Sequence, residues 1–131
     1  MKSIKVLALV GDEGIENIIQ RVVEKFGKEH KDCALSITFV RKIQELKTHL
    51  QLGQGFAKTC PYDLLIVGNK VRDGYALQGG VPREIRFQYP AVRMVFLSAL
   101  HFPLLAKEVE AKELPKDMLV ESLKKLLETF C

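Results

Sequence analysis

The chain has 131 residues, 47% of them hydrophobic and 27% charged, with a net charge of +4 and a pI near 9.0. This length allows one globular domain with a hydrophobic core, residues 1–131, and excludes a second domain of ordinary size. Every apolar stretch is far shorter than the roughly 20 residues of a membrane-spanning helix. The amino terminus has no signal region, so we expect a cytoplasmic protein without membrane partners.

Apolar patterns at the start of the chain predict a strand, a helix and a second strand. Residues 4–10 are nearly all apolar, which is typical of a strand covered on both faces. Apolar residues at helical spacing over 15–26 predict a helix that Gly27 ends. A β-branched and aromatic run over 35–40 predicts the next strand.

The same alternation continues to the carboxyl terminus, with one interruption. Residues 68–80 contain several glycines and have too little periodicity for a helix. The other expected elements are a helix over 43–50 that ends before the glycines of segment 53–55, a strand over 63–67, a helix over 81–88, a strand over 92–98, a helix over 102–110, a strand over 111–114 and a helix over 118–127.

This alternation of five strands and five helices predicts an α/β fold with a parallel sheet and helices on both faces. Right-handed crossovers lead to a doubly wound sheet, and the flavodoxin-like order 2-1-3-4-5 is the usual arrangement at this length. In such folds, ligands bind where the strands end, at the carboxyl edge of the sheet. We therefore expect functional side chains in the loops that follow the strands.

Cysteines, histidines and basic residues give no sign of a metal or nucleic-acid site. Cys33, Cys60 and Cys131 are widely separated, and no ligand spacing joins them to the three histidines. We expect reduced thiols, with Cys60 a passive side chain. The basic residues, including Arg41 and Arg86, are spread along the chain without clustered arginines. This spread predicts a solvated exterior and disfavours a nucleic-acid partner.

Three short motifs that follow strands carry a resemblance to a known family. Residues 11–13 are Gly-Asp-Glu, residues 97–99 are Leu-Ser-Ala, and residues 114–116 are Leu-Pro-Lys. Their order resembles the receiver domain of bacterial response regulators (CheY-like) over essentially the whole chain. Receivers carry an acidic pair after the first strand, an aspartate ending the third, a threonine or serine ending the fourth and a lysine after the fifth.

In this resemblance, glycine replaces two of the family's acids. Gly11 stands at the first acid of the pair, and Gly68 stands at the phosphoacceptor aspartate. The family chemistry needs a carboxylate nucleophile and a Mg²⁺ ion held by carboxylates. Asn69 is no substitute nucleophile, and Asp12 with Glu13 would bind Mg²⁺ only weakly. The degenerate phosphorylation-site positions are Asp12, Glu13, Gly68, Asn69, Ser98 and Lys116.

The resemblance therefore implies a pseudo-receiver, a non-enzymatic signalling module without a cofactor. Such a module would bind a regulatory protein, for example a kinase or a transcription factor. The surface expected to bind it is the last strand with its two flanking helices, or the first helix. Receivers that switch conformation carry an aromatic residue three places before the lysine, and here that residue is Glu113.

Three other functions stay open. The first is a divergent phosphoreceiver in a phosphorelay that uses Asp63 or Asp73, although Asp63 begins a strand and would lie at the opposite edge. The second is a flavodoxin-like enzyme or carrier that binds a flavin or a small phosphate ligand. The third is a small nucleic-acid-binding regulator, suggested by the net charge alone.

Several of these residues also have structural interpretations. Asp12 and Glu13 suit the start of a helix, whose dipole favours acids. Ser98 is expected to satisfy backbone groups at a strand end, and Lys116 to form a loose ion pair with Asp12. Three aromatic side chains are expected in the core rather than as exposed anchors: Tyr75, Phe87 and Phe102.

Overall fold

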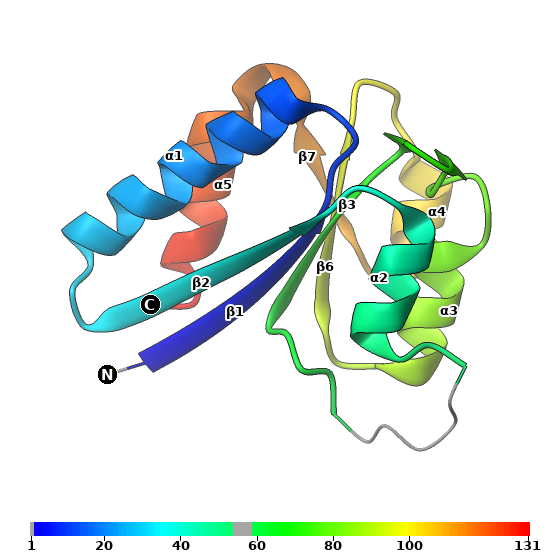
Figure 1. The fold of residues 1–131 in the computed structure, drawn as a ribbon, viewed down its shortest axis with the longest axis horizontal. Helices are drawn as coiled ribbons and strands as arrows, with labels where there is room; N and C mark the ends of the chain where they lie inside the picture. Colours follow the sequence, from blue (N-terminus) through cyan, green and yellow to red (C-terminus); the bar gives the residue numbers. More distant parts are fainter. Residues whose placement is uncertain (1, 54–58) are drawn as a thin grey trace.

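The computed structural model describes residues 2–53 and 59–131 of the chain. Its main strands are β1 (Lys2–Leu9), β2 (Cys33–Val40), β3 (Leu64–Gly68), β6 (Arg93–Ser98) and β7 (Lys112–Pro115). These five strands are parallel and lie in the order β2-β1-β3-β6-β7 (Figure 1). Numbered among themselves, they have the predicted order 2-1-3-4-5. The doubly wound, flavodoxin-like fold class is therefore confirmed.

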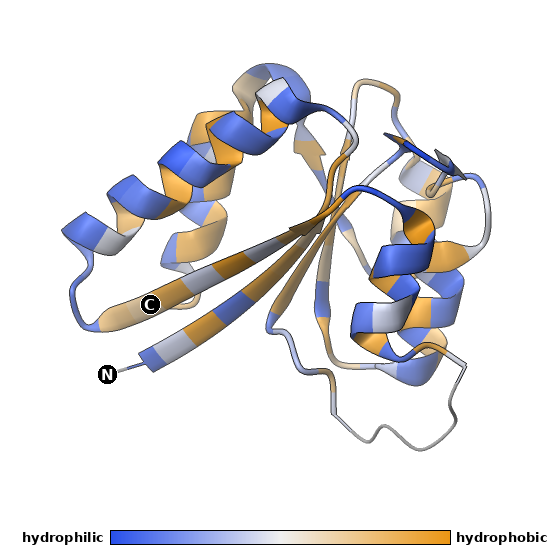
Figure 2. Ribbon diagram, in the orientation of Figure 1, coloured by the Kyte–Doolittle hydropathy of each residue, from blue (hydrophilic) through white to orange (hydrophobic). Residues whose placement is uncertain are grey.

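Helices cover both faces of the sheet (Figure 1). On one face lie α1 (Glu13–Glu29) and α5 (Leu119–Glu128), which follows the 3-10 turn η1 (Lys116–Met118); on the other lie α2 (Ile43–Leu50), α3 (Val81–Gln88) and α4 (Pro103–Glu108). Each face has its own apolar cluster, because successive strand side chains point to opposite faces. The strands are mostly hydrophobic, with hydrophilic segments in β1 and β6; the inner sides of the helices are hydrophobic and their outer sides hydrophilic (Figure 2).

Helix α3 has the predicted bounds and α2 ends before Gly53 as predicted, but α1 does not end at Gly27 as predicted. The last turn closes at His30, whose backbone N–H donates to the Phe26 carbonyl at 2.9 Å and whose ring stacks on the Phe26 ring. This contact continues the helical hydrogen bonding past Gly27. Among the described residues, no helix is long and apolar enough to cross a membrane.

The segment 68–80 contains a small antiparallel hairpin, formed by β4 (Lys70–Val71) and β5 (Gly74–Tyr75). The described residues thus form seven strands. The prediction of five strands is wrong, because it did not include the two strands of this hairpin. Each of its strands has only two residues, which is too short for a periodic pattern to indicate. Gly74 has a φ of 145°, which glycine adopts readily and other residues rarely do.

Cys33 and Cys131 form a disulfide bond, so the expectation of reduced thiols is wrong for this pair. They are 98 residues apart in the sequence, and only the fold brings the carboxyl terminus beside the start of β2 (Figure 1). Cys60 is the free cysteine. Disulfides are typical of oxidising compartments, so this bond does not favour the cytoplasmic location, which stays a prediction.

Two basic side chains expected on the solvated exterior instead join parts of the fold. Arg41 donates to both carboxylate oxygens of Glu16 on α1, at 3.2 and 3.3 Å, and this contact raises the pKa of Arg41. The half-buried guanidinium of Arg86 donates to four backbone carbonyls at 2.7 to 3.2 Å, those of Tyr89, Pro90, Val92 and Val109.

Candidate functional site

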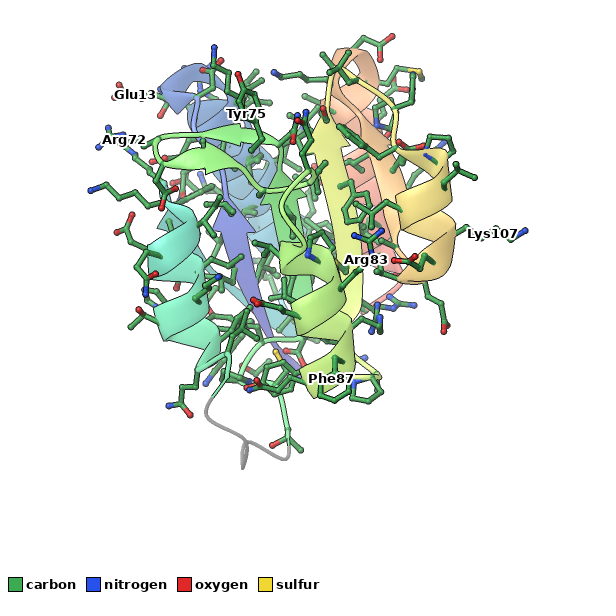
Figure 3. The ribbon with its side chains drawn as sticks, turned by 90° about the vertical axis from the view of Figure 1, so that its right-hand side faces the viewer. Glu13, Arg72, Tyr75, Arg83, Phe87 and Lys107 are labelled. Atoms are coloured by element: carbon green, nitrogen blue, oxygen red, sulfur yellow. A yellow bond between two sulfur atoms is a disulfide. The ribbon has the colours of Figure 1, made fainter. Side chains whose placement is uncertain are left out.

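A pocket of about 270 Å³ opens at the carboxyl ends of β1, β3 and β6, where this fold class predicts a ligand site. Five of the six predicted site residues line it: Asp12, Gly68, Asn69, Ser98 and Lys116. The sixth, Glu13, lies in the first turn of α1 and outside the pocket lining (Figure 3). The motifs that follow separate strands therefore meet at one place.

Backbone atoms closely surround the two glycines at the receiver-like acid positions. A Cβ at Gly68 would lie 2.8 Å from the Leu9 carbonyl oxygen. A Cβ at Gly11 would lie 2.6 Å from the Lys70 carbonyl oxygen and 2.8 Å from the Val71 Cα. Such distances are shorter than real Cβ contacts, so a side chain at either position requires the backbone to move. The β4–β5 hairpin thus occupies the space beside Gly11.

The Asp12 carboxylate caps helix α1. Its Oδ1 accepts from the backbone N–H groups of Gly14 at 2.7 Å and Ile15 at 3.3 Å. These bonds satisfy free donors of the first helical turn, which confirms the helix-start interpretation of Asp12. The ion pair predicted between Asp12 and Lys116 is wrong, because these two described residues have no N–O contact within 4.0 Å. The cap directs the carboxylate to α1 instead.

Asn69 fixes the hairpin to the end of β3. It is the buried polar residue among those described. Its side-chain Oδ1 accepts from the Leu77 N–H at 3.2 Å, and its backbone carbonyl accepts from the Ala76 N–H at 2.8 Å. A buried amide with these partners has a structural role, since leaving its oxygen or the Leu77 N–H unpaired would be costly.

Asp73, in the hairpin turn, caps a helix from a distant part of the chain. Its carboxylate accepts from the backbone N–H groups of Ile43 at 2.6 Å and Gln44 at 3.2 Å, at the start of α2. Lys42, the residue at the N-cap position itself, makes no side-chain cap bond. The Ile43 N–H is the main cause that lowers the pKa of Asp73. This carboxylate is engaged as a cap, which disfavours Asp73 as a phosphoacceptor.

Two further side chains accept from backbone groups near the pocket. The Ser98 Oγ accepts from the Leu100 N–H at 3.1 Å, which confirms its expected role at a strand end. Glu113, at the position of the family's aromatic switch, accepts from the Phe102 N–H at 2.5 Å. That bond ties the loop between β6 and α4 to β7.

Lys70 and Lys116 supply the positive charge of the pocket, and neither forms an ion pair with any described residue. Tyr75 also lines the pocket and is 50% exposed, contrary to the predicted core location (Figure 3). Phe87 is 91% exposed, which is also contrary to prediction, whereas Phe102 packs against the core as expected. The place of Lys70 and Tyr75 in the pocket was not predicted, because the hairpin that carries both residues has no periodic pattern in the sequence.

Asp63 and Cys60 lie at the other end of the sheet from the pocket. Asp63 accepts from the Lys5 N–H at 2.8 Å, at the amino end of the strands, so the predicted place of this carboxylate is confirmed. Burial raises the pKa of the Cys60 thiol, which keeps it protonated, as expected of a passive side chain. Within residues 2–53 and 59–131, no three His, Cys, Asp or Glu side chains are grouped closely enough to hold a metal.

Comparison with known proteins finds similar structures but no match among family models or curated proteins. The phosphorylated cyanobacterial phytochrome response regulator RcpA is 14% identical with a TM-score of 0.75, over 98% of this chain and 94% of that one. The non-phosphorylated HemR receiver domain from Leptospira biflexa is 17% identical with a TM-score of 0.72, over 97% and 93%. Chemotaxis protein CheY4 from Vibrio cholerae is 18% identical with a TM-score of 0.72, over 98% and 99%.

These similar structures are receiver domains of response regulators, and the chain has their CheY-like fold. Identities of 14% to 18% show a common fold and leave the chemistry to be argued from the site.

Proposed function

We propose that this chain is a receiver-like signalling module that binds a regulatory protein and does not use aspartyl phosphorylation. The observation that carries the proposal is the packing around Gly11 and Gly68. A Cβ at either glycine would lie 2.6 to 2.8 Å from backbone atoms. The site therefore lacks the two acids of the family, and its backbone leaves no room for their side chains. The residue at the receiver-like phosphoacceptor position is Gly68, which has no carboxylate.

The residues present also fit Mg²⁺ poorly. Magnesium needs near-octahedral oxygen ligands and is held in proteins by carboxylates. Asp12 is the carboxylate in the pocket lining, and one of its oxygens is already used by the cap of α1. Lys70 and Lys116 line the same pocket and repel a cation.

Partner binding is assigned to the surface formed by α4, β7 and α5. Leu104 on α4 is 85% exposed, and Leu100, just before this helix, is 62% exposed. These side chains contribute little to the core and gain by burial against another protein. The Glu113 bond to the Phe102 N–H fixes the loop that carries Leu100, so this surface is held in one arrangement. Such a surface suits constitutive binding.

Phosphorylation is tested by NMR with Mg²⁺ and beryllofluoride, a phosphoryl mimic. We expect no saturable shifts at the ends of β1, β3 and β6, and no stable label from acetyl phosphate. The Asp12→Asn variant is the matched control, because asparagine still caps a helix but carries no charge. Shifts in the wild type that disappear in this variant would overturn the proposal and support a divergent phosphoreceiver.

Partner binding is tested by affinity capture from cells that express the protein naturally, followed by measurement of affinity for the captured protein. Leu104→Lys should abolish the interaction. Phe87→Lys is the matched control, because Phe87 is 91% exposed but lies on α3, outside the proposed surface. Equal losses in both variants, or in neither, would contradict the assignment of the surface.

The pocket supports a second candidate function, the binding of a small anionic ligand. Lys70, Lys116 and the Ser98 hydroxyl converge on it. Its volume of about 270 Å³ is just below the roughly 300 to 1,000 Å³ of typical small-molecule sites, which disfavours a flavin. Isothermal titration with inorganic phosphate and with flavin mononucleotide separates the cases. Micromolar binding that is lost in Lys116→Ala would favour this function over partner binding alone.

A further inference from the structure

The outer edge of β2 is an unprotected strand edge. β2 is the first strand of the sheet order, so it pairs on one side with β1, and no strand among the described residues pairs with its other side (Figure 1). It has eight residues, Cys-Ala-Leu-Ser-Ile-Thr-Phe-Val, with no charge and no proline. Long, uncharged edges of this kind are templates for the addition of another strand.

The opposite edge of the sheet differs in every one of these respects. β7 has four residues, and among them are Lys112, Glu113 and Pro115. A short strand with charges and a proline is how natural sheets protect an edge against pairing. The contrast singles out β2 as the edge available to a partner.

The backbone pattern shows which groups of β2 point outward. The carbonyls of Asp32 and Val40 accept from the Lys2 and Val10 N–H groups on the β1 side, at 2.9 and 3.0 Å. Strand residues alternate in the direction of their hydrogen bonds, so the even-numbered residues between them also face β1. The odd-numbered residues face outward. The Cys33 N–H is already bonded to the His30 carbonyl at 3.1 Å, and the other outward residues are Leu35, Ile37 and Phe39. Among the described residues, none of their N–H groups donates to a backbone group beyond the sheet.

We propose that β2 pairs with β2 of a second copy of this chain, antiparallel and centred on Ile37. In this register, Ile37 lies opposite Ile37 of the copy, and Leu35 lies opposite Phe39 of the copy. The outward N–H and C=O groups of these residues then form hydrogen bonds between the two strands. The two five-stranded sheets become one continuous sheet. The surface of α4, β7 and α5 stays free at each far end for the proposed regulatory protein.

Side chains support a second copy as the occupant, because this register pairs like with like on both faces. Leu35, Ile37 and Phe39 are half-buried against the α1 and α5 cluster, and pairing places them beside the same three residues of the copy. Such cross-strand apolar pairs stabilise sheets. On the other face, Ser36 lies opposite Thr38, a hydrogen-bonding pair.

Charges at the ends of the paired strands are also complementary. Just before β2 lies Asp32, and two residues after it lies Lys42; both are exposed and neither forms an ion pair with a described residue. With Ile37 at the centre, Asp32 of one copy lies opposite Lys42 of the other, at both ends. The register thus brings opposite charges together outside β2, whose eight residues carry no charge.

Sedimentation velocity over a concentration series tests the proposal, with two matched double variants. Ser36→Lys with Thr38→Lys places lysine opposite lysine at two symmetric positions, and we expect the dimer to weaken by about tenfold or more. Ser36→Lys with Thr38→Glu places lysine opposite glutamate and should dimerise at least as well as the wild type. Circular dichroism checks that both variants keep the native fold. Each sample is run oxidised and reduced, because an intermolecular disulfide would mimic a dimer.

A wild-type protein that stays monomeric throughout the series would overturn the proposal and leave the β2 edge to a strand of another protein. A dimer that both double variants form equally well would also overturn it, since another surface would then carry the contact. Loss of the dimer in the lysine variant and its retention in the lysine–glutamate variant is the result that supports it. Phosphorylation and partner capture do not enter this measurement, so it is independent of the proposed function.

Discussion

Side chains bond to the backbone at both ends of the sheet, but they act mostly as acceptors at one end and mostly as donors at the other. At the carboxyl end, side-chain oxygens accept from backbone N–H groups; the acceptors are Asp12, Asn69, Asp73, Ser98 and Glu113. At the amino end, side chains donate to backbone carbonyls; the donors are Arg86, Gln88 and Tyr89. Asp63 and Gln88 are exceptions, because their side-chain oxygens accept at the amino end from the backbone N–H groups of Lys5 and Gly53.

This difference follows from the parallel βα arrangement. Every helix begins near the carboxyl end of the strands and ends near the amino end, so unpaired N–H groups collect at one end and unpaired carbonyls at the other. Acids near the carboxyl edge therefore bind the free N–H groups of helix starts, which leaves their carboxylates unavailable to a ligand. Asp12 and Asp73 resemble functional acids in the sequence and serve as helix caps in the structure.

Removing the disulfide bond at the amino end of the sheet should lower the free energy of unfolding more than any other change. The Cys33–Cys131 bond spans 98 residues, and closing a loop of about 100 residues corresponds to about 4.7 kcal/mol in the chain-entropy model. We expect the double variant Cys33→Ser, Cys131→Ser to lose about 4 kcal/mol of unfolding free energy in guanidinium titrations. Cys60→Ser is the control and should change little. Equal stability of oxidised and reduced wild type would contradict a closed bond.

Removing the main donor of the amino end should have the next largest effect. Arg86→Met leaves the carbonyls of Tyr89, Pro90, Val92 and Val109 without their charged donor, and we expect a loss of about 3 kcal/mol in urea unfolding. Arg83→Met is the matched control on the same helix. Arg83 is exposed and pairs with Glu108, so its loss should cost about 0 to 1 kcal/mol. Similar losses in both variants would refute the special role of Arg86.

At the carboxyl end, a side chain introduced at Gly68 should destabilise the fold and should not create a phosphorylation site. Gly68→Ala places a Cβ against the Leu9 carbonyl, and we expect a loss of about 2 kcal/mol. Gly68→Asp should lose more, because it also buries a carboxylate. Gly27→Ala is the control, since a Cβ there meets nothing within 4 Å and should add about 0.5 to 1 kcal/mol. A Gly68→Asp protein as stable as the wild type would show that the backbone yields easily.

The smallest expected effect is on the pH dependence of stability, through the Asp73 cap of α2 at the carboxyl end. The folded-state pKa of Asp73 is lowered from its ordinary 3.8 by the Ile43 N–H. The cap therefore stabilises the fold fully above that ordinary value and loses its contribution as the pH falls through the lowered folded-state pKa. Thermal unfolding at a series of pH values should show a shallower acid decline for Asp73→Asn than for the wild type. Identical declines would show that the cap carries no charge-dependent stability.

The pattern of residues was sufficient for the fold class and for most of the helix and strand positions. Buried strands such as β3 are continuous apolar runs, and helices such as α3 begin with a proline in the first turn and end before Tyr89-Pro90. These signals are local in the chain, so they can be interpreted without knowing the fold. The hairpin of β4 and β5 has two residues per strand and carries no such signal.

The candidate site was predicted in location but not in its contacts. Residues that follow parallel strands must meet at one edge, so Asp12, Gly68 and Ser98 could be grouped from the sequence. The partners of these residues come from elsewhere in the chain. The Asp12 cap, in place of the expected ion pair with Lys116, depends on where the side chains point.

By itself, the sequence determined the order and kind of the main elements, the doubly wound sheet and the absence of a carboxylate at position 68, because each depends on residue types and their spacing. Tertiary structure alone decided the disulfide between Cys33 and Cys131, the Asp73 cap on α2 and the hairpin packed beside Gly11. Each of these joins segments far apart in the chain. Such contacts exist only after the chain has closed on itself, and no local pattern encodes their geometry.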